Sequence, residues 1–302
     1  MRYLLRYHAE YRYSGPVFDQ HNVLRVTPAT SPLQRVRGFR VVVEPSARTR
    51  TYSDYFGTEV VEFNVPGEHE RLAITAEGEV VNEEPSAPPD GDWELTKADA
   101  YTARGGEFLL RADDEPANGG LAELRDAIAA ETPRETLEAL CRVVPDRFAY
   151  KPGATFVGST VDDLLEGGAG VCQDFVHLSL ILLRDAGLAA RYVSGYLFAG
   201  PPSAGQVPRG SGGASPQLSS GSGNSVEVNT HAWVEALVPG ADGEEAVWVG
   251  ADPTNRKLAG DEHVKIGHGR HYGDVAPIRG VYRGAGGAAG HEVNVRMTRV
   301  TS

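Results

Sequence analysis

The first eighty residues alternate between apolar and polar side chains with the period of two that is typical of β-strands. Five such segments, rich in β-branched and aromatic residues, lie between residues 2 and 82 and are separated by Gly, Pro, Ser and Asp. In the first segment, alternate side chains from Tyr3 to Tyr13 share one face. Such strands, joined by short turns, predict a small antiparallel β domain, most simply a sandwich.

A proline-rich stretch, PSAPPDGD at residues 85–92, interrupts this pattern and cannot continue a strand or a helix. We therefore predict an N-terminal β domain over residues 1–84 and a second domain over residues 93–302. A chain of 302 residues is long enough for two domains, each with its own hydrophobic core.

In the second predicted domain, the apolar residues recur at the spacing typical of α-helices instead of alternating with polar ones. Capping residues Thr132 and Thr160 begin two predicted helices. The segment 171–186 is apolar around most of its girth and ends before Gly187, as a buried helix would. The segments ARYVSGYLF, HAWVEALV, AVWVGADPT and HEVNVRMTRV then read as strands. The expected fold class is α+β.

Residues 200–226 break this order of helices and strands. They are rich in Gly, Ser and Pro and have too few apolar side chains to pack, so we expect a flexible inserted loop. Loops of this length inside a compact domain are usually functional or disordered.

The charge of the chain limits its partners. Its formal net charge of −12 repels polyphosphates and anionic bilayers, so we expect neither nucleic acid nor membrane as a partner. No apolar stretch approaches the roughly 20 residues of a membrane span. Charges at Arg2, Arg6 and Glu10 interrupt any signal-peptide core, so a cytoplasmic location is the expectation.

Only two cysteines occur, and their surroundings differ. Cys141 lies on the apolar stripe of its helix, where a thiol usually serves as small apolar filling. Cys172 falls in the first turn of the buried helix, directly after a glycine-rich turn. The helix dipole there favours an anion, and the free N–H groups can stabilise an oxyanion beside the sulfur. Cys172 is therefore the candidate nucleophile.

A histidine and an aspartate on the following strands could complete a triad. If these strands form a hairpin in which Leu237 faces Ala246, His231 faces Asp252 as a direct cross-strand neighbour. A one-residue slip would place the two on opposite sheet faces. In the favourable register, His231 would take the proton of Cys172 and Asp252 would orient the imidazole.

The motifs around these residues resemble those of bacterial transglutaminase-like proteins. The resemblance rests on GVCQDFVHL, ARYVSGYL, THAWVEA and GADPTN, on HVKIGHGRHYGDVAPIRGVYRG downstream, and on RYHAEYRYSGPV, HNVLRVTP and DYFGTEVVEF near the N-terminus. It implies a papain-like core with Cys172, His231 and Asp252 as the catalytic triad. The Ca²⁺-binding loops of animal transglutaminases have no counterpart, so we expect no metal and no cofactor.

Other residues near these motifs have two interpretations each. Gln173 and Asp174 could support the site or merely cap the helix. Trp233 could wall the cleft or fill the core, and its strand parity slightly favours the cleft.

The remaining histidines fit structural positions better than catalytic ones. We expect His177 to be a hydrogen-bonded structural residue, because it lies more than a helical turn from Cys172. His263, His268 and His271 lie among glycines without metal-ligand spacing, so we expect a surface loop.

The resulting hypothesis is thiol-dependent acyl transfer on a peptide or protein substrate. Hydrolysis by a peptidase or amidase is favoured, because water needs no dedicated second site. Amine transfer by a crosslinking transglutaminase uses the same triad and stays open. A binding module that retains the fold is the third alternative, although it would have no chemical need for the triad. The sequence does not indicate whether the β domain recruits a partner or forms dimers.

Overall fold

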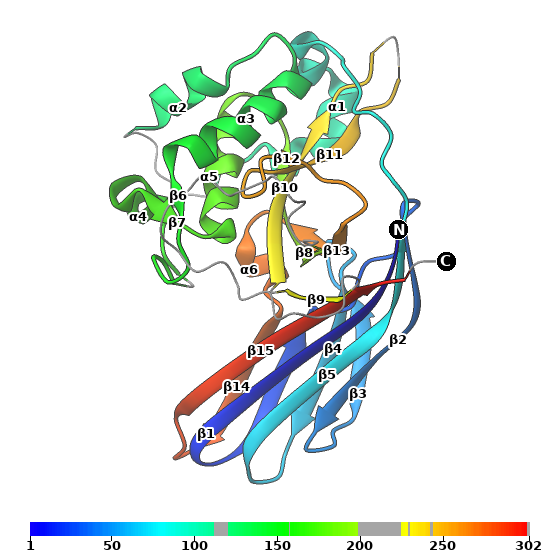
Figure 1. The fold of residues 1–302 in the computed structure, drawn as a ribbon, viewed down its shortest axis with the longest axis vertical. Coiled ribbons are helices and arrows are strands. Elements are labelled where there is room, and N and C mark those ends of the chain that lie inside the picture. Colours follow the sequence, from blue (N-terminus) through cyan, green and yellow to red (C-terminus); the bar gives the residue numbers. More distant parts are fainter. Residues whose placement is uncertain (112–119, 157, 199–224, 229, 242–243, 301–302) are drawn as a thin grey trace.

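The protein consists of a long curled antiparallel sheet below a mixed helix–sheet layer (Figure 1). The computed structural model describes residues 1–111, 120–156, 158–198, 225–228, 230–241 and 244–300. Most of the predicted loop at 200–226 lies outside the described residues, and its last two positions belong to a strand, Ser225–Val228. None of the described helices is long and apolar enough to cross a bilayer.

The lower sheet has eight strands, and β1 (Arg2–Leu24) lies at its centre. The others are β2 (Gln34–Glu44), β3 (Thr49–Ser53), β4 (Glu59–Val65), β5 (His69–Asn82), β9 (Ser225–Val228), β14 (Ile278–Gly284) and β15 (Ala288–Arg299). The first half of β1 pairs with β5 and β15, and its second half pairs with β4 and β14. The strands therefore form one continuous curled sheet rather than the two sheets of a sandwich.

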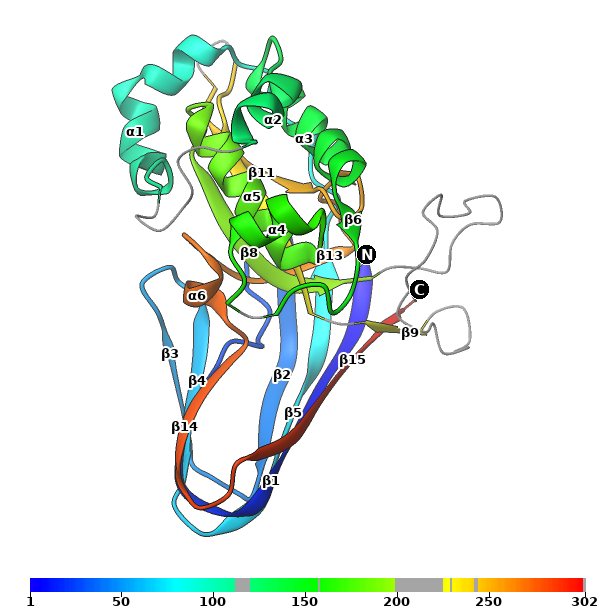
Figure 2. The same ribbon diagram turned by 90° about the vertical axis from the view of Figure 1, so that its left-hand side faces the viewer.

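The two C-terminal strands belong to this lower sheet, although the sequence analysis placed them in the second domain. Strand β15 runs antiparallel to β1, with Leu5 opposite Met297 and Tyr7 opposite Val295. All four of these side chains are buried. The N-terminal sheet thus depends on residues from the far end of the chain, as Figure 2 shows where β1 and β15 lie side by side.

The upper layer contains a five-stranded sheet with the order β12–β11–β10–β8–β13. Its strands are β8 (Ala190–Leu197), β10 (Thr230–Val238), β11 (Val247–Asp252), β12 (Lys257–Leu258) and β13 (His263–Gly269). The helices are α1 (Asp99–Gly105), α2 (Leu121–Ile128), α3 (Pro133–Arg147), α4 (Val161–Gly167), α5 (Cys172–Asp185) and α6 (Tyr272–Val275), with short 3₁₀ turns at Trp93–Lys97 and Gly106–Phe108. A two-stranded parallel pair joins β6 (Ala149–Tyr150) to β7 (Ala169–Gly170).

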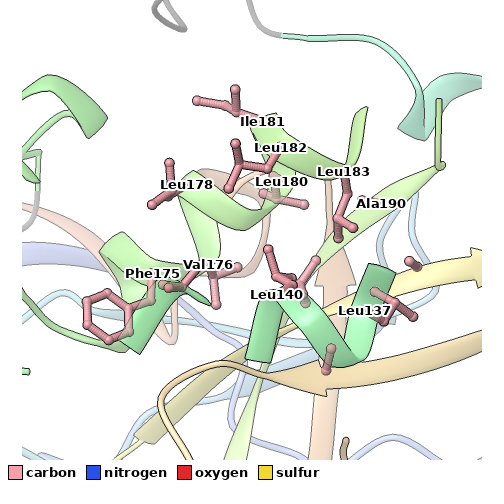
Figure 3. Close-up of a cluster of buried hydrophobic side chains, with 14 of the residues drawn as sticks. Leu137, Leu140, Phe175, Val176, Leu178, Leu180, Ile181, Leu182, Leu183 and Ala190 are labelled. Carbon is pink, nitrogen blue, oxygen red and sulfur yellow. The ribbon is translucent and has the colours of Figure 1, made fainter. Parts of the chain in front are cut away.

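Helix α5 packs on β10 and β8 of the upper sheet and beside α2, α3 and α4, and it is buried, as its apolar surface predicts (Figure 3). Leu178, Leu182 and Leu183 are fully buried in a cluster that also contains Ala232 and Val234 of β10. The predicted cap at Thr132 is confirmed, because its Oγ1 accepts from the backbone N–H of Glu135 at 3.2 Å. Thr160 caps α4 in the same way.

The opposite face of the upper sheet packs on the lower sheet. Tyr196, Val264 and Ile266 belong to the same buried cluster as Tyr3 and Leu5. The hydroxyl of Tyr196 donates to the carbonyl of Val26 at 2.8 Å. The two layers therefore share one hydrophobic core, and the upper sheet is covered on both faces.

The role of β15 in the lower core leads to a stability prediction. We expect Met297→Ala to lower the free energy of unfolding by about 2–5 kcal/mol, because it opens a cavity under a fully buried side chain. Leu4→Ala is the control, since Leu4 lies on the outer face of β1 and is 49% exposed; its effect should stay within about 0.5 kcal/mol. Urea unfolding of the full chain measures both, and equal effects would contradict the assignment.

Candidate active site

Cys172 is the first residue of α5 and lies at the end of a tight connection. Helix α4 ends at Gly167 and is followed by Gly168, whose φ of 65° favours glycine, and β7 then leads into α5. The Cys172 thiol is free and half-buried. It therefore lies beside the backbone N–H groups at the start of the helix, as the sequence predicts.

Asp174 holds the start of this helix in place. Its Oδ2 accepts from the Val171 backbone N–H at 2.7 Å and from the Thr155 hydroxyl at 2.6 Å. The carboxylate is buried, and a Cβ on Gly170 would lie 2.8 Å from the same oxygen. Asp174 therefore caps the helix that presents Cys172, and Gly170 lets the chain pass close to that cap.

His231 and Asp252 meet at the ends of β10 and β11. The Nε2 atom of His231 lies 2.8 Å from Oδ2 of Asp252, which is completely buried. The register differs from the expected one by two residues, because Val234 rather than Ala232 faces Ala251. An even shift keeps both side chains on the same face, so they meet diagonally instead of directly across the hairpin.

The imidazole of His231 connects the thiol to the carboxylate. Since Nε2 faces Asp252, Nδ1 is the ring nitrogen left for the hydrogen bond with Cys172. Burial alone would lower the pKa of His231, but the charge and hydrogen bond of Asp252, together with Cys172, raise it to about 10. The imidazolium form is therefore strongly favoured in the folded protein.

Asp252 remains ionised although it is buried. Burial opposes its charge, but the charge and hydrogen bond of His231 and the hydrogen bond of His263 outweigh this cost and lower the pKa of Asp252. Asn255 adds two further bonds, from its backbone N–H to Oδ1 at 3.1 Å and from its Nδ2 to Oδ2 at 2.7 Å.

The position of His263 is a correction to the sequence analysis, which placed it in a surface loop. It begins strand β13, is buried, and has its Nε2 3.0 Å from Oδ2 of Asp252. Its Nδ1 accepts from the Gly260 backbone N–H at 3.1 Å, so Nε2 carries the proton and donates to Asp252. The sequence contained no signal for this contact, because His263 is separated from Asp252 by a turn and belongs to a non-adjacent strand.

The ligand atoms of His231, Asp252 and His263 lie within 4.8 Å of one another, which is close enough to hold a metal ion. Their arrangement suits a carboxylate better than a cation. Both the backbone N–H and the side-chain amide of Asn255 donate toward Asp252, and Nδ1 of His263 is already occupied by Gly260. A cation there would have to displace this set of donors.

Cys141 lies behind the aspartate, on the buried side of α3. Its thiol donates to the carbonyl of Lys257 at 3.3 Å and lies close to Asp252. Burial raises the pKa of Cys141 to about 12. This thiol therefore packs beneath β11 in its protonated form, in keeping with the predicted structural role.

The other predicted residues occupy distinct places. Gln173 is half-buried at the second position of α5. Trp233 is buried, stacks near the His231 ring at a centroid distance of 6.2 Å and meets His263 edge-on at 5.2 Å. His177 accepts a hydrogen bond from the backbone N–H of Tyr272.

The two histidines downstream of His263 also differ from each other. His268 lies in β13 with its Nε2 3.2 Å from Arg191 Nη1, so it too is outside a surface loop. Burial lowers the pKa of His268 to about 3. His271 is largely exposed just before α6.

Two sequence profiles match the chain. That of the bacterial transglutaminase-like N-terminal region matches residues 3–81, and that of the transglutaminase-like superfamily matches residues 122–253. An uncharacterized protein of Mycobacterium leprae is 34% identical over 96% of both chains. The chain belongs to the transglutaminase-like superfamily. An uncharacterized protein of Mycobacterium tuberculosis is 31% identical over 93% of this chain and 87% of its own length.

One solved structure shares the fold of this transglutaminase-like protein, and another is a weaker match. The structure named "Putative Cysteine Protease" from Cytophaga hutchinsonii has a TM-score of 0.69 and covers 98% of this chain and 90% of its own, at 18% identity. The periplasmic domain of TgpA from Pseudomonas aeruginosa matches with a TM-score of 0.37 and 21% identity, over 83% of this chain and 88% of that domain. The Cytophaga structure covers nearly the whole of this chain, so the shared fold includes both the lower sheet and the upper layer.

The raised pKa of His231 leads to a prediction about its titration. We expect its imidazolium to persist at pH 8 and to titrate near pH 10, and Asp252→Asn to lower this pKa because the paired charge is lost. The associated stability is complete below the ordinary pKa of 6.5 and is lost as pH rises toward 10. Nitrogen-15 NMR of the histidine rings measures the titration. Asp274→Asn is the control, and the assignment fails if both variants have the same effect.

The hydrogen bond from His263 leads to a second prediction. We expect His263→Leu to lower the free energy of unfolding by about 1–3 kcal/mol, because buried Asp252 loses a donor and the Gly260 N–H loses its acceptor. His271→Leu should change it by less than about 0.5 kcal/mol, because that side chain is largely exposed. Denaturant unfolding at neutral pH compares the two, and a small effect of His263→Leu would contradict its assigned contact.

Proposed function

We propose that this transglutaminase-like protein is a cysteine enzyme that cleaves carboxamide or peptide bonds through a thioester. The observation that carries the proposal is the chain of contacts from a thiol at a helix N-terminus, through His231, to a buried and ionised Asp252. A module that only binds would have no chemical need for this arrangement.

In the proposed first step, the Cys172 thiolate attacks the carbonyl carbon and forms a carbon–sulfur bond. Negative charge moves to the carbonyl oxygen, where the backbone N–H groups at the start of α5 are the nearest fixed donors. The His231 imidazolium then protonates the leaving nitrogen as the carbon–nitrogen bond breaks. A thioester on Cys172 and neutral His231 remain.

In the second step, neutral His231 takes a proton from the incoming nucleophile, which attacks the thioester carbon. The carbon–sulfur bond then breaks, so Cys172 leaves as the thiolate and His231 is again the imidazolium. Water gives a carboxylic acid, and a primary amine gives a new amide. Asp252 keeps the imidazole in one orientation throughout, because four hydrogen bonds fix its own carboxylate. We favour water as the acceptor, since hydrolysis needs no additional binding site, and amine transfer is the alternative.

The substrate class proposed is a peptide or protein. The aromatic side chain of Tyr150 supports a site open to large substrates, because it is 47% exposed and its β6 strand pairs with the segment that leads into Cys172. Nucleic acid and membrane are not proposed as partners, and the cytoplasmic location stays a prediction.

Selective alkylation tests the nucleophile. We expect brief iodoacetamide treatment at neutral and mildly acidic pH to label Cys172 and to leave Cys141 unlabelled, because only Cys172 is accessible and paired with an imidazolium. Intact mass and peptide mapping read out the site. Cys172→Ala should abolish both labelling and thioester formation, whereas Cys141→Ala should retain them. Equal, slow labelling of both thiols would favour the binding module.

Incubation with a glutamine-containing peptide, with and without a primary amine, separates the two acceptors. A mass gain of the amine on the peptide identifies transfer, and a glutamate or a cleaved peptide alone identifies hydrolysis. Loss of either product in Cys172→Ala is the required control.

A further inference from the structure

A second cavity lies on the face of the upper sheet that is turned away from α5. Its volume is about 710 Å³, and it is lined in part by the proline-rich linker around Ala87 and by the segment before β2. Cys172, His231 and Asp252 are not among the described residues that line it, whereas Trp233 and His263 are. A cavity of this size can enclose a small organic ligand or a short segment of peptide.

Asn82 fixes one edge of the wall. It is 4% exposed, and its Nδ2 donates to the carbonyls of Asp261 and His263 at 3.0 and 2.9 Å. Its Oδ1 has no hydrogen-bond partner among the described residues and is covered by the surrounding atoms. Asn82 therefore holds the backbone before β13 beside the cavity, and the acceptor for a ligand comes from elsewhere in the wall.

Glu235 provides an acceptor for a ligand. Nε and Nη2 of Arg191 and Nζ of Lys265 all lie 2.6 Å from the same oxygen, Oε2. The other oxygen, Oε1, accepts none of these three bonds and is left to accept from a ligand. Lys265 also lines the cavity and has further N–H groups to donate, so the wall offers one acceptor and one donor.

The charges around the cavity balance, which argues against a strongly charged ligand. Its four carboxylates are Glu83, Glu84, Glu235 and Glu262. Four cations accompany them, because Arg35 pairs with Glu83, Lys257 with Glu262, and Arg191 and Lys265 with Glu235. A neutral group with one donor and one acceptor fits this wall better than an ammonium or a carboxylate does.

The apolar part of the wall would hold the body of such a ligand. Trp233 and Trp248 contribute indole surfaces, and Val247 and Leu258 add aliphatic ones. Arg191 stacks on Trp248 at 3.9 Å from the ring centroid and so fixes that indole in place. The site thus has the character of a small-molecule pocket, with apolar walls and a few placed polar groups.

We propose that this cavity is a second binding site, which takes a neutral amide group, either a primary carboxamide or a peptide bond. The amide N–H would donate to Glu235 Oε1, and the amide carbonyl would accept from Lys265. The site adjoins the triad, since Asn82 bonds the His263 backbone and His263 bonds Asp252. It does not depend on reaction at Cys172, so it can be tested in a chain without the nucleophile.

The indole N–H signals of the Cys172→Ala chain provide the test by two-dimensional NMR. The chain has three tryptophans, of which Trp233 and Trp248 line the cavity. Trp93 donates to the carbonyl of Ala130 elsewhere and serves as the internal control. We expect isovaleramide to shift the Trp233 and Trp248 signals in a saturable way and to leave Trp93 unchanged.

Matched probes identify the group that is recognised. Methyl isovalerate has the same shape without an N–H and should bind about tenfold more weakly, which corresponds to about 1.4 kcal/mol. N-methylisovaleramide represents a peptide bond. Binding of isovaleramide and N-methylisovaleramide with similar affinity would identify a peptide-bond site, and binding of isovaleramide alone would identify a carboxamide site.

Two variants test the location. Ala87→Phe should abolish the shifts, because Ala87 lines the cavity and is exposed, while the equivalent change at exposed Ala103 on α1 should preserve them. Glu235→Gln should weaken binding about tenfold, because the three donors at Oε2 select the amide oxygen and turn its NH₂ toward the cavity.

Several outcomes would overturn the proposal. These are an absence of saturable shifts, which would mean that water alone fills the cavity, equal affinity for ester and amide, or shifts that survive Ala87→Phe. None of these results would alter the labelling of Cys172 in the unmodified chain, so the two proposals fail independently.

Discussion

The buried negative charge of Asp252 is the constraint on which the site depends. An ionised carboxylate with no solvent exposure must be compensated by donors, and here they come from three separate parts of the chain, His231, His263 and Asn255. Satisfying this one group therefore fixes β10, the turn after β11 and the start of β13 relative to one another. The imidazole that faces Cys172 acquires its orientation and its raised pKa from the same group.

The nucleophile is fixed independently of that carboxylate. Asp174 ties the first turn of α5 to Val171 and Thr155, and the apolar side chains of α5 pack the helix against the upper sheet and its neighbouring helices. The two halves of the site thus rest on different interactions, a capped helix and a compensated charge. Cys172 and His231 come together because α5 packs on β10, which contains His231, and on the neighbouring strand β8.

The lower sheet contributes to the site through shared packing. Its core includes Tyr196, Val264 and Ile266 from the upper sheet, and β15 closes it by returning beside β1. Asn82, at the end of β5, reaches His263 from this lower layer and also lines the second cavity. The N-terminal sheet therefore helps to position His263, which hydrogen-bonds Asp252 of the proposed triad.

The sequence alone determined the features that depend on local pattern. It predicted the α+β class, the buried helix with Cys172 in its first turn, and the caps at Thr132 and Thr160, because each follows from spacing or from neighbouring residues. It permitted a common face for His231 and Asp252 in one register but did not select that register. Tertiary structure decided the contacts between distant segments. The two-residue register shift, the pairing of β15 with β1 and the contact of His263 with Asp252 depend on how sheets curl and pack. Local sequence patterns do not predict these contacts. The partners are far apart in the chain, and they come together only when the hydrophobic core packs and the buried carboxylate acquires its donors.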